Sequence, residues 1–249
     1  MKIATWNVNG VRARHAQVVE WAQRERPDVI CLQELKATVD QVPAPLCTLD
    51  GYWCYWHGYK AYSGVGLQVR RELAAEQPEF SHPPFDLESR IVTARIGALT
   101  VASIYVPNGG KDYAAKLRFL EALAAYAATF RAAGAPLVLC GDFNVTRTEM
   151  DVHPKERKPE VIGQRAEERA LIQQLLDQGG LVDVARLLEP DNAELFTWWA
   201  PWRQMRQRNI GWRLDYVFAS AELAANAKSC PSLREVGTSD HAPVVATFG

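Results

Sequence analysis

Short apolar runs alternate with helical stretches along all 249 residues, and this alternation is typical of α/β folds. The strand-like runs occupy residues 3–8, 29–32, 64–69, 91–96, 99–106, 137–140, 214–219 and 244–248. Helical patterns occupy residues 14–26, 114–133 and 167–178, and a further element begins within 181–188. No repeat or low-complexity linker divides the chain, so we expect one α/β domain over residues 1–249.

Composition limits the compartment and the kinds of partner that we expect for the protein. The formal net charge of −1 excludes a uniformly basic surface, so any contact with nucleic acid needs a local cluster of positive charge. The five cysteines form no C-x-x-C pair, which favours free thiols and a reducing compartment. The N-terminus lacks the apolar core of a signal peptide, and no run reaches the roughly 20 apolar residues of a membrane span. We expect a cytoplasmic monomer without a membrane partner.

Polar side chains gather where the apolar strands end. They are Asn7, Glu34, Asp142 and Asn144, together with the Asp240-His241 pair before the last strand. In open α/β sheets, ligands bind in a crevice at the ends of strands. Several carboxylates in one crevice repel each other unless a cation lies among them. This pattern therefore favours a site for a cation and a ligand.

The donor atoms of this group indicate which cation. Asn, Asp and Glu offer oxygen ligands, which suit Mg²⁺ or Mn²⁺. Glu34 with Asn7 or Asp240 would suffice to bind such an ion, which can stabilise charge on a phosphate undergoing attack. Asp142 is the candidate base for an attacking water, and Asn144 would hold its geometry.

A second group of residues suits proton donation to a phosphate. Asp215 could orient His241 and favour its charged ring, whose other nitrogen could donate to a phosphoryl oxygen. Tyr105 follows a strand and could donate to the phosphate or its leaving group. Taken singly these signals are weak, because Gly-Asp and Asn-Gly pairs are usually turns and a lone tyrosine usually packs in the core. Their joint occurrence favours a phosphoryl-transfer site.

Six motifs in order resemble the exonuclease III type of apurinic/apyrimidinic endonuclease, within the endonuclease/exonuclease/phosphatase superfamily. They are WNVNG, LQELK, YVPNGG, GDFNV, GWRLDY and TSDHAP. The resemblance implies a four-layered α/β sandwich, in which two mixed β-sheets pack face to face between helices. It also implies a metal-dependent enzyme of base excision repair that acts on duplex DNA.

The resemblance assigns roles to the same residues. It implies a Mg²⁺ or Mn²⁺ site formed among Asn7, Glu34, Asp142, Asn144, Asp240 and His241. It implies catalytic roles for Tyr105, Asp142, Asn144, Asp215 and His241. Asn9 stands where some relatives have aspartate, which makes this site less anionic and leaves open whether one or two metal ions bind.

Residues 195–216 carry the expected substrate preference. This segment interleaves four tryptophans with Arg203, Arg206, Arg208 and Arg213. One interpretation is a buried aromatic cluster beside a solvated basic loop. The other is an apolar pocket for an abasic sugar beside a strip that binds phosphates, because a nucleotide without a base is extruded most easily. Relatives form this pocket at the positions matching Trp198, Trp212 and Leu214.

Basic residues elsewhere suggest a track for the DNA backbone. Lys36, Arg90 and Lys111 are candidates, together with the run at residues 155–158. In relatives, the loop position of Lys111 carries a residue that probes the opened duplex.

The expected reaction is hydrolysis of the phosphodiester 5′ to an abasic site, leaving a 3′-hydroxyl. Exonuclease action from 3′ to 5′ and removal of 3′-blocking groups by phosphodiesterase or phosphatase action are further expected activities. The main alternative is a non-catalytic nucleic-acid-binding regulator on the same fold, in which the metal and base positions are lost. This chain keeps Glu34, Asp142 and His241, which favours the enzyme. A lipid phosphatase is disfavoured by the Trp- and Arg-rich segment, and a secreted nuclease by the lack of a signal sequence.

Overall fold

The computed structural model describes all residues from 1 to 249, in two six-stranded sheets. The first sheet has the order β11 (Ala227–Ser229), β12 (Val244–Phe248), β1 (Lys2–Asn7), β2 (Val29–Gln33), β4 (Val65–Arg70), β3 (Tyr52–His57). The second has the order β5 (Glu79–Ser81), β6 (Ile91–Ile96), β7 (Leu99–Tyr105), β8 (Leu137–Asp142), β10 (Asp215–Ser220), β9 (Leu181–Asp183). Only the β1–β2 and β7–β8 pairs are parallel, so both sheets are mixed.

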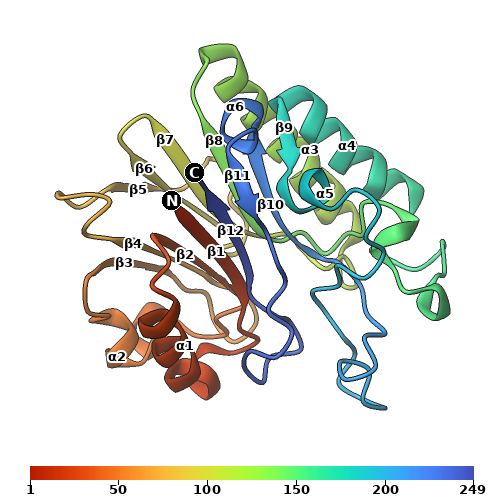
Figure 1. Cartoon of the computed structure of the whole chain (residues 1–249), viewed down its shortest axis with the longest axis horizontal. Helices are drawn as coiled ribbons and strands as arrows, with labels where there is room; N and C mark the ends of the chain where they lie inside the picture. Colours follow the sequence, from red (N-terminus) through yellow and green to blue (C-terminus); the bar gives the residue numbers. More distant parts are fainter.

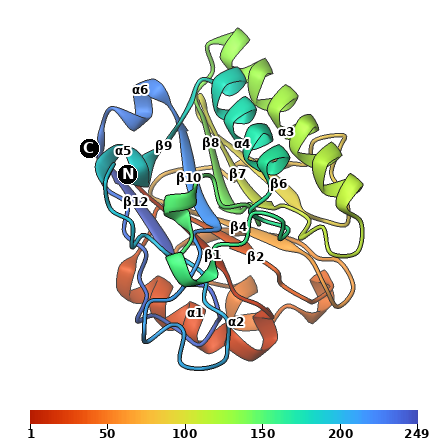
Figure 2. The ribbon, with the colours of Figure 1, turned by 90° about the vertical axis from the view of Figure 1, so that its right-hand side faces the viewer.

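Helices cover the outer faces of both sheets and complete four layers (Figures 1 and 2). α1 (Val11–Glu25) and α2 (Ala44–Cys47) lie on the first sheet, and α3 (Tyr113–Ala133) and α4 (Ala166–Gly179) lie on the second. The shorter helices are α5 (Val184–Leu188), α6 (Ala221–Ala224) and the 3₁₀ turns Val39–Gln41, Glu149–Asp151 and Pro154–Glu156. The expected four-layered α/β sandwich is confirmed.

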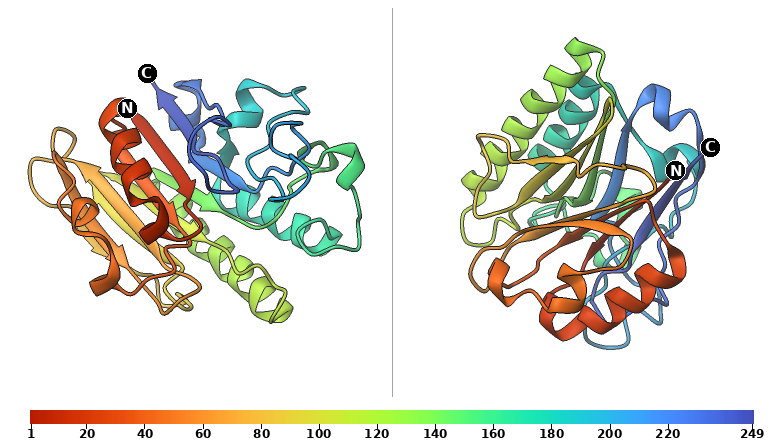
Figure 3. Two further views of the ribbon diagram at one scale, coloured as in Figure 1. Left: turned by 90° about the horizontal axis from the view of Figure 1, so that it is seen from below. Right: turned by 90° about the vertical axis from the view of Figure 1, so that its left-hand side faces the viewer.

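Three apolar cores correspond to the three interfaces between these layers. The central core joins the facing sides of the two sheets, through residues such as Val29 and Val138. The outer cores lie under α1 and α2, and under α3 and α4. The N- and C-terminal strands β1 and β12 pair antiparallel, so the two ends of the chain lie side by side (Figure 3). No helix has both the length and the apolar character needed to span a bilayer.

The limits of the long helices follow from local chemistry. α3 begins after Asp112, whose carboxylate accepts a hydrogen bond of 2.9 Å from the amide of Ala115. It ends at Gly134, which has the left-handed φ of 62° that glycine adopts without steric cost. α1 begins at Val11, earlier than expected, because the turn at Gly10 leads directly into the helix.

Three strands were missed by the sequence reasoning. β3 reads YWCYWH, without the alternation of apolar and polar residues that marks a half-buried strand. β5 and β11 have only three residues each, and all three missed strands lie at sheet edges. The element expected over residues 181–188 is in fact two, the strand β9 followed by helix α5.

The alternation of side chains along the strands carries polar groups to one end of the central core. On β8, Val138 and Cys140 belong to that core, and Asp142 is next on the same face. On β1, Asn7 follows Ile3 and Thr5 on the face toward the second sheet. The apolar interface between the sheets therefore ends in a group of buried polar side chains.

Candidate active site

Three neighbouring strands of the second sheet align their functional residues side by side. Asp142 on β8 is the register partner of Tyr105 on β7 and of Asp215 on β10. Gly141 permits this arrangement, because its φ is 151° and a Cβ there would collide with the carbonyl of Ile104. A substitution at Gly141 would therefore displace Asp142.

The first sheet contributes Asn7 and Glu34 from the ends of β1 and β2. The amide nitrogen of Asn7 donates 2.9 Å hydrogen bonds to Oε2 of Glu34 and to Oδ2 of Asp142. Glu34 itself has a left-handed φ of 56°, and Asn144 has one of 52°. Such conformations in residues other than glycine carry strain and concentrate at functional sites. The amide of Asn7 thus joins the carboxylates of two sheets in one cluster.

Asp142 is 1% exposed, and its carboxylate accepts hydrogen bonds from several sides. Oδ1 accepts from the backbone amide of Asn144 at 2.9 Å, and Oδ2 accepts from the Asn7 amide. Burial and the nearby charge of Asp215 raise the pKa of Asp142 to about 7, although the charge of His241 opposes the shift. The residue can therefore both accept and release a proton near neutral pH.

His241 forms a buried dyad with Asp215. Its Nδ1 lies 2.8 Å from Oδ2 of Asp215, and its Nε2 lies 3.8 Å from Oδ2 of Asp142. Burial alone would favour a neutral ring, but the two carboxylates raise the pKa of His241 to about 10. Thr197 fixes the dyad, since its hydroxyl donates to the same Asp215 oxygen at 2.6 Å. The ring is therefore positively charged at neutral pH.

Tyr105, at the end of β7, and Arg90, just before β6, form one wall of the cluster. The guanidinium carbon of Arg90 lies 4.8 Å from the centre of the Tyr105 ring, and the Tyr105 amide donates to the Arg90 carbonyl. Burial and the charges of Glu34 and Asp142 raise the pKa of Tyr105, so its hydroxyl stays protonated and can donate. Nη1 of Arg90 is buried without a partner in the protein, which leaves a donor for a bound anion.

The donor set at Glu34 fits a hard divalent cation. Nζ of Lys36 lies 2.9 Å from Oε1 of Glu34 and 2.6 Å from Oδ1 of Asn9, so a positive charge already lies against these oxygens. Glu34, the carboxylate of Asp142 and the side chain of Asn7 together offer oxygen ligands of the kind that Mg²⁺ prefers. Lys36 therefore contacts a proposed ligand, Glu34, in addition to its expected role in binding DNA.

Asp240 lies beside this group and is held by two donors. Oδ1 accepts from the Asn9 amide at 2.7 Å, and Oδ2 accepts from the Trp198 indole at 3.0 Å. Burial opposes ionisation, but the charge of His241 and these two hydrogen bonds lower the pKa of Asp240. Asn9 thus orients Asp240 through its side-chain amide.

An aromatic wall adjoins the His241 dyad. The rings of Trp198 and Trp212 meet edge to face, with centres 5.5 Å apart, and the Trp198 ring lies 6.5 Å from His241. Trp212 is half-buried and its Nε1 has no partner in the protein. Leu214 is 5% exposed, and its backbone amide donates a 3.0 Å hydrogen bond to the hydroxyl of Thr197, which contacts Asp215. The two expected pocket tryptophans therefore lie together next to the polar cluster, and Leu214 joins the same region through Thr197.

Two of the four arginines expected to bind phosphate have structural roles instead. Arg213 is 2% exposed and forms ion pairs with Asp151 and Asp183, at 2.8 and 2.7 Å. Arg206 stacks on Trp199 and donates to backbone carbonyls of the segment before β12. The sequence could not separate these residues from solvated arginines, because their acidic and carbonyl partners are distant in the chain.

The remaining basic candidates are accessible. Arg203 and Arg208 are exposed, as are Lys111, Lys155, Arg157 and Lys158. Lys111 lies 5.9 Å from the centre of the exposed Tyr62 ring. Trp202 is 60% exposed on the same loop as Arg203. An exposed indole beside arginines suits contact with a nucleic acid backbone and its bases.

Sequence reasoning missed a buried cation behind the site. Lys116 on α3 is fully buried, and its ammonium donates to the carbonyls of Asn108 and Asn144 at 3.2 and 2.8 Å. The ammonium also contacts the carboxylate of Glu168 on α4, which is likewise buried. Lys116 thereby fixes the backbone that carries Asn144. Lys116 lies on the same buried face of α3 as Leu120 and Leu123, but lysine is so rarely buried that the sequence reasoning did not mark it.

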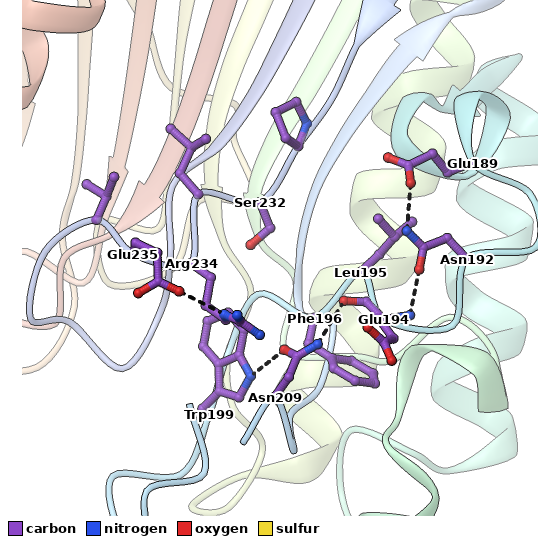
Figure 4. A pocket seen from close by; sticks show the side chains of 13 residues that line it. Glu189, Asn192, Glu194, Leu195, Phe196, Trp199, Asn209, Ser232, Arg234 and Glu235 are labelled. Atoms are coloured by element: carbon purple, nitrogen blue, oxygen red, sulfur yellow. Dashed lines mark hydrogen bonds and ion pairs between the residues drawn. The ribbon is translucent and has the colours of Figure 1, made fainter. Parts of the chain in front are cut away.

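A pocket of about 540 Å³ lies elsewhere on the surface, between residues 189–199 and 231–236 (Figure 4). Its walls include the Trp199 indole, whose Nε1 donates a 3.2 Å hydrogen bond to Oδ1 of Asn209, and the ion pair between Arg234 and Glu235. None of the proposed catalytic side chains lines it. It is therefore separate from the polar cluster.

The fold and the buried cluster of carboxylates, amide and histidine define a class of α/β sandwich hydrolases. Residues 4–241 match the endonuclease/exonuclease/phosphatase family, and the chain belongs to this family. It is 33% identical to the DNA repair nuclease APEX1 of Danio rerio, over 98% of this chain and 81% of the relative.

Solved structures agree with this family. An AP endonuclease from Archaeoglobus fulgidus superposes with a TM-score of 0.89 at 30% identity, covering 100% of this chain and 99% of the other. The 3′ phosphatase NExo from Neisseria, solved with a product DNA hairpin, also gives a TM-score of 0.89, at 33% identity and with the same coverage.

Proposed function

We propose that the protein is a DNA-repair nuclease that hydrolyses the phosphodiester 5′ to an abasic site in duplex DNA and leaves a 3′-hydroxyl. The observation that carries this proposal is the position of Asp142, which contacts the Asn7 amide and lies 3.8 Å from the charged ring of His241. Residues 1–249 would act as one catalytic domain. Exonuclease action from 3′ to 5′ and removal of 3′-blocking groups use the same chemistry at a strand end.

In this proposal Asp142 accepts the proton of the attacking water, and Asn144 holds the carboxylate through its backbone amide. The His241 ring, kept charged by Asp215, donates from Nε2 to a phosphoryl oxygen. Tyr105 donates from its hydroxyl to the phosphate or the leaving 3′-oxygen. The water oxygen bonds to phosphorus as the bond to the 3′-oxygen breaks, and that oxygen takes up a proton.

We assign the cation site to Glu34, Asn7 and Asp142, with Asp240, Asn144 and His241 around them. Mg²⁺ or Mn²⁺, when bound, would stabilise negative charge on the phosphate. The ammonium of Lys36 would have to leave Oε1 of Glu34 as the ion binds, and it could then contact the DNA backbone.

The preference for abasic sites is assigned to Trp198, Trp212 and Leu214, of which the two tryptophans form an aromatic wall. An extruded sugar without a base presents little polar surface to this wall, whereas a normal nucleotide would need to be unpaired first. Lys36, Arg90 and Lys111 would contact the DNA backbone or the opened duplex. The family relationship to a DNA repair nuclease and an AP endonuclease supports this assignment.

The proposal also covers the compartment and the oligomeric state of the enzyme. All five cysteines are free thiols, which supports work in a reducing compartment such as the cytoplasm. We propose that the protein acts as a monomer on duplex DNA.

The direct test compares two duplexes, one with an internal tetrahydrofuran abasic analogue and one undamaged with a recessed 3′ end. The proposal expects incision of the first in Mg²⁺, on its 5′ side. If only the recessed end is degraded, the proposed abasic-site incision is wrong and the protein is a 3′-exonuclease. Binding without product from either duplex would favour the non-catalytic regulator.

A further inference from the structure

A group of side chains with metal-ligand atoms lies at the edge of the sandwich that β3 and β5 form, opposite β9 and β11. The strands β3 and β5 end their respective sheets on the same side. The ring of Tyr55 on β3 stacks on that of Phe80 on β5, with centres 4.9 Å apart. His57, at the end of β3, stacks on His82, just after β5, with centres 3.7 Å apart. The two sheet edges are thus held together by side chains.

Asp86 completes this group. Its Oδ2 lies 2.6 Å from Nε2 of His57. One ligand atom from each of His57, His82 and Asp86 lies within 4.8 Å of the others. The side chains of His57 and Asp86 are 25% and 14% exposed, so an ion can reach them from solvent.

Surrounding hydrogen bonds already orient two of the three ligands. Nδ1 of His82 lies 3.0 Å from the carbonyl of Ile91, which can only accept, so Nδ1 carries the proton and Nε2 is an acceptor. The hydroxyl of Tyr55 lies 2.9 Å from that Nε2. Oδ1 of Asp86 accepts from the amides of Arg90 and Ile91, at 2.8 and 3.0 Å, which leaves Oδ2 available. Metal-binding histidines and carboxylates are typically held in this way.

We propose that His57, His82 and Asp86 bind a divalent transition-metal ion of the Zn²⁺ class. Two imidazole nitrogens and one carboxylate oxygen are the donors that such ions select, whereas the oxygen-rich cluster at Glu34 suits Mg²⁺. Water would complete the coordination. The ion would replace the hydrogen bonds from His57 to Asp86 and from Tyr55 to His82.

Binding there would reinforce a segment that leads to the candidate active site. Asp86 holds the amides of Arg90 and Ile91, and Arg90 packs on the ring of Tyr105. The ion would also link β3 of one sheet to the loop after β5 of the other. We therefore expect Zn²⁺ to raise the unfolding temperature of the chain.

The test measures Zn²⁺ binding in a Glu34→Gln background, so that the candidate active site contributes little. Competition with a chromophoric chelator gives the stoichiometry and the affinity. The proposal expects one Zn²⁺ per chain in Glu34→Gln, and binding weaker by roughly 10- to 100-fold or more in Glu34→Gln/His82→Gln. The matched control is Glu34→Gln/His15→Gln, since His15 is a half-buried histidine on α1 that also contacts a backbone carbonyl. This control should bind as Glu34→Gln does.

Equal Zn²⁺ affinity with and without His82, or no bound Zn²⁺ in Glu34→Gln, would overturn the proposal. The single variant His82→Gln should keep its Mg²⁺-dependent cleavage and its circular dichroism spectrum, which separates loss of metal from loss of fold. If His82→Gln does not fold, Co²⁺ added to Glu34→Gln decides the question. Visible absorption with the strength of four- or five-coordinate Co²⁺ is expected, and its absence would contradict the site.

Discussion

The side-chain amide of Asn7 donates a 2.9 Å hydrogen bond to Oδ2 of Asp142, and this bond crosses from one sheet to the other. Each residue comes at the end of a strand whose alternate side chains form the central core. The packing of the sandwich therefore sets the distance between the proposed ligand and the proposed base. Reactive geometry of this kind depends on rigid elements more than on loops.

Lys116 offers a test of how the core supports the site. Lys116→Met leaves the buried carboxylate of Glu168 without its cation, so the free energy of unfolding should fall by about 3–5 kcal/mol. Urea unfolding measures this change. Lys228→Met, at an exposed position, is the control and should change little. A loss below about 1 kcal/mol in Lys116→Met would mean that the pair behaves like a surface ion pair.

The pKa of His241 can be measured from its ring protons by NMR in the metal-free protein. In wild type the pKa is raised from 6.5 to about 10, so the ring should remain charged at neutral pH. Asp215→Asn removes the carboxylate that contributes most to this rise, so the pKa should fall towards its ordinary value. A wild-type ring that titrates near 6.5 would contradict the dyad.

The same shift has a consequence for stability. Because the folded-state pKa of His241 lies above its unfolded value, its charged ring stabilises the fold below pH 6.5. That stabilisation is lost as the pH rises from 6.5 towards 10. The pKa of Asp142 is raised from 3.8 to about 7, so its protonated carboxyl stabilises the fold below pH 3.8. This stabilisation is lost as the pH rises from 3.8 to about 7. In Asp215→Asn, the free energy of unfolding should change less between pH 6.5 and 10 than it does in the wild type. An unchanged dependence on pH would contradict the role of Asp215 in raising the pKa of His241.

The sequence predicted the fold class well, but not all of its parts. Long periodic segments such as α3 and buried runs such as β8 were confirmed, because burial on one or both faces leaves a strong pattern. The edge strands β3, β5 and β11 were missed, since short or aromatic edge strands have no such pattern. The face-to-face packing of two sheets came from the family resemblance and not from periodicity.

For the candidate site, the motifs predicted which polar residues meet, and the structure brings them together. Their catalytic roles stay predictions. The misassigned residues were arginines: Arg213 and Arg206 are held by partners far away in the chain, and a local sequence window cannot show such partners. For the same reason the sequence did not predict the roles of Lys116 and Thr197, which contact Glu168 and Asp215 respectively.

Trp212 should matter for the abasic sugar more than for the duplex as a whole. We expect Trp212→Ala to lower the rate of abasic incision by roughly 10- to 200-fold, as loss of apolar contacts in a specificity pocket does. Affinity for undamaged duplex should change much less. Trp53→Ala, on the edge strand β3, serves as the control for loss of an indole remote from the site. Equal losses in incision and in duplex binding would indicate that Trp212 only packs.

Metal dependence tests the oxygen cluster at Glu34. EDTA should abolish cleavage, and added Mg²⁺ or Mn²⁺ should restore it. Glu34→Gln should raise the Mg²⁺ concentration for half-maximal activity by about tenfold or more, because it removes a charged ligand. Full activity in EDTA would exclude this account of the cation.

The most direct measurement is the rate of incision of a tetrahydrofuran-containing duplex by Asp142→Asn in saturating Mg²⁺. Asparagine keeps the shape of the side chain but cannot accept the proton of the attacking water. The account predicts a fall in turnover on the order of 10²–10⁴, with the fold and duplex binding retained. Turnover close to that of the wild type would contradict the assignment of Asp142 as the base.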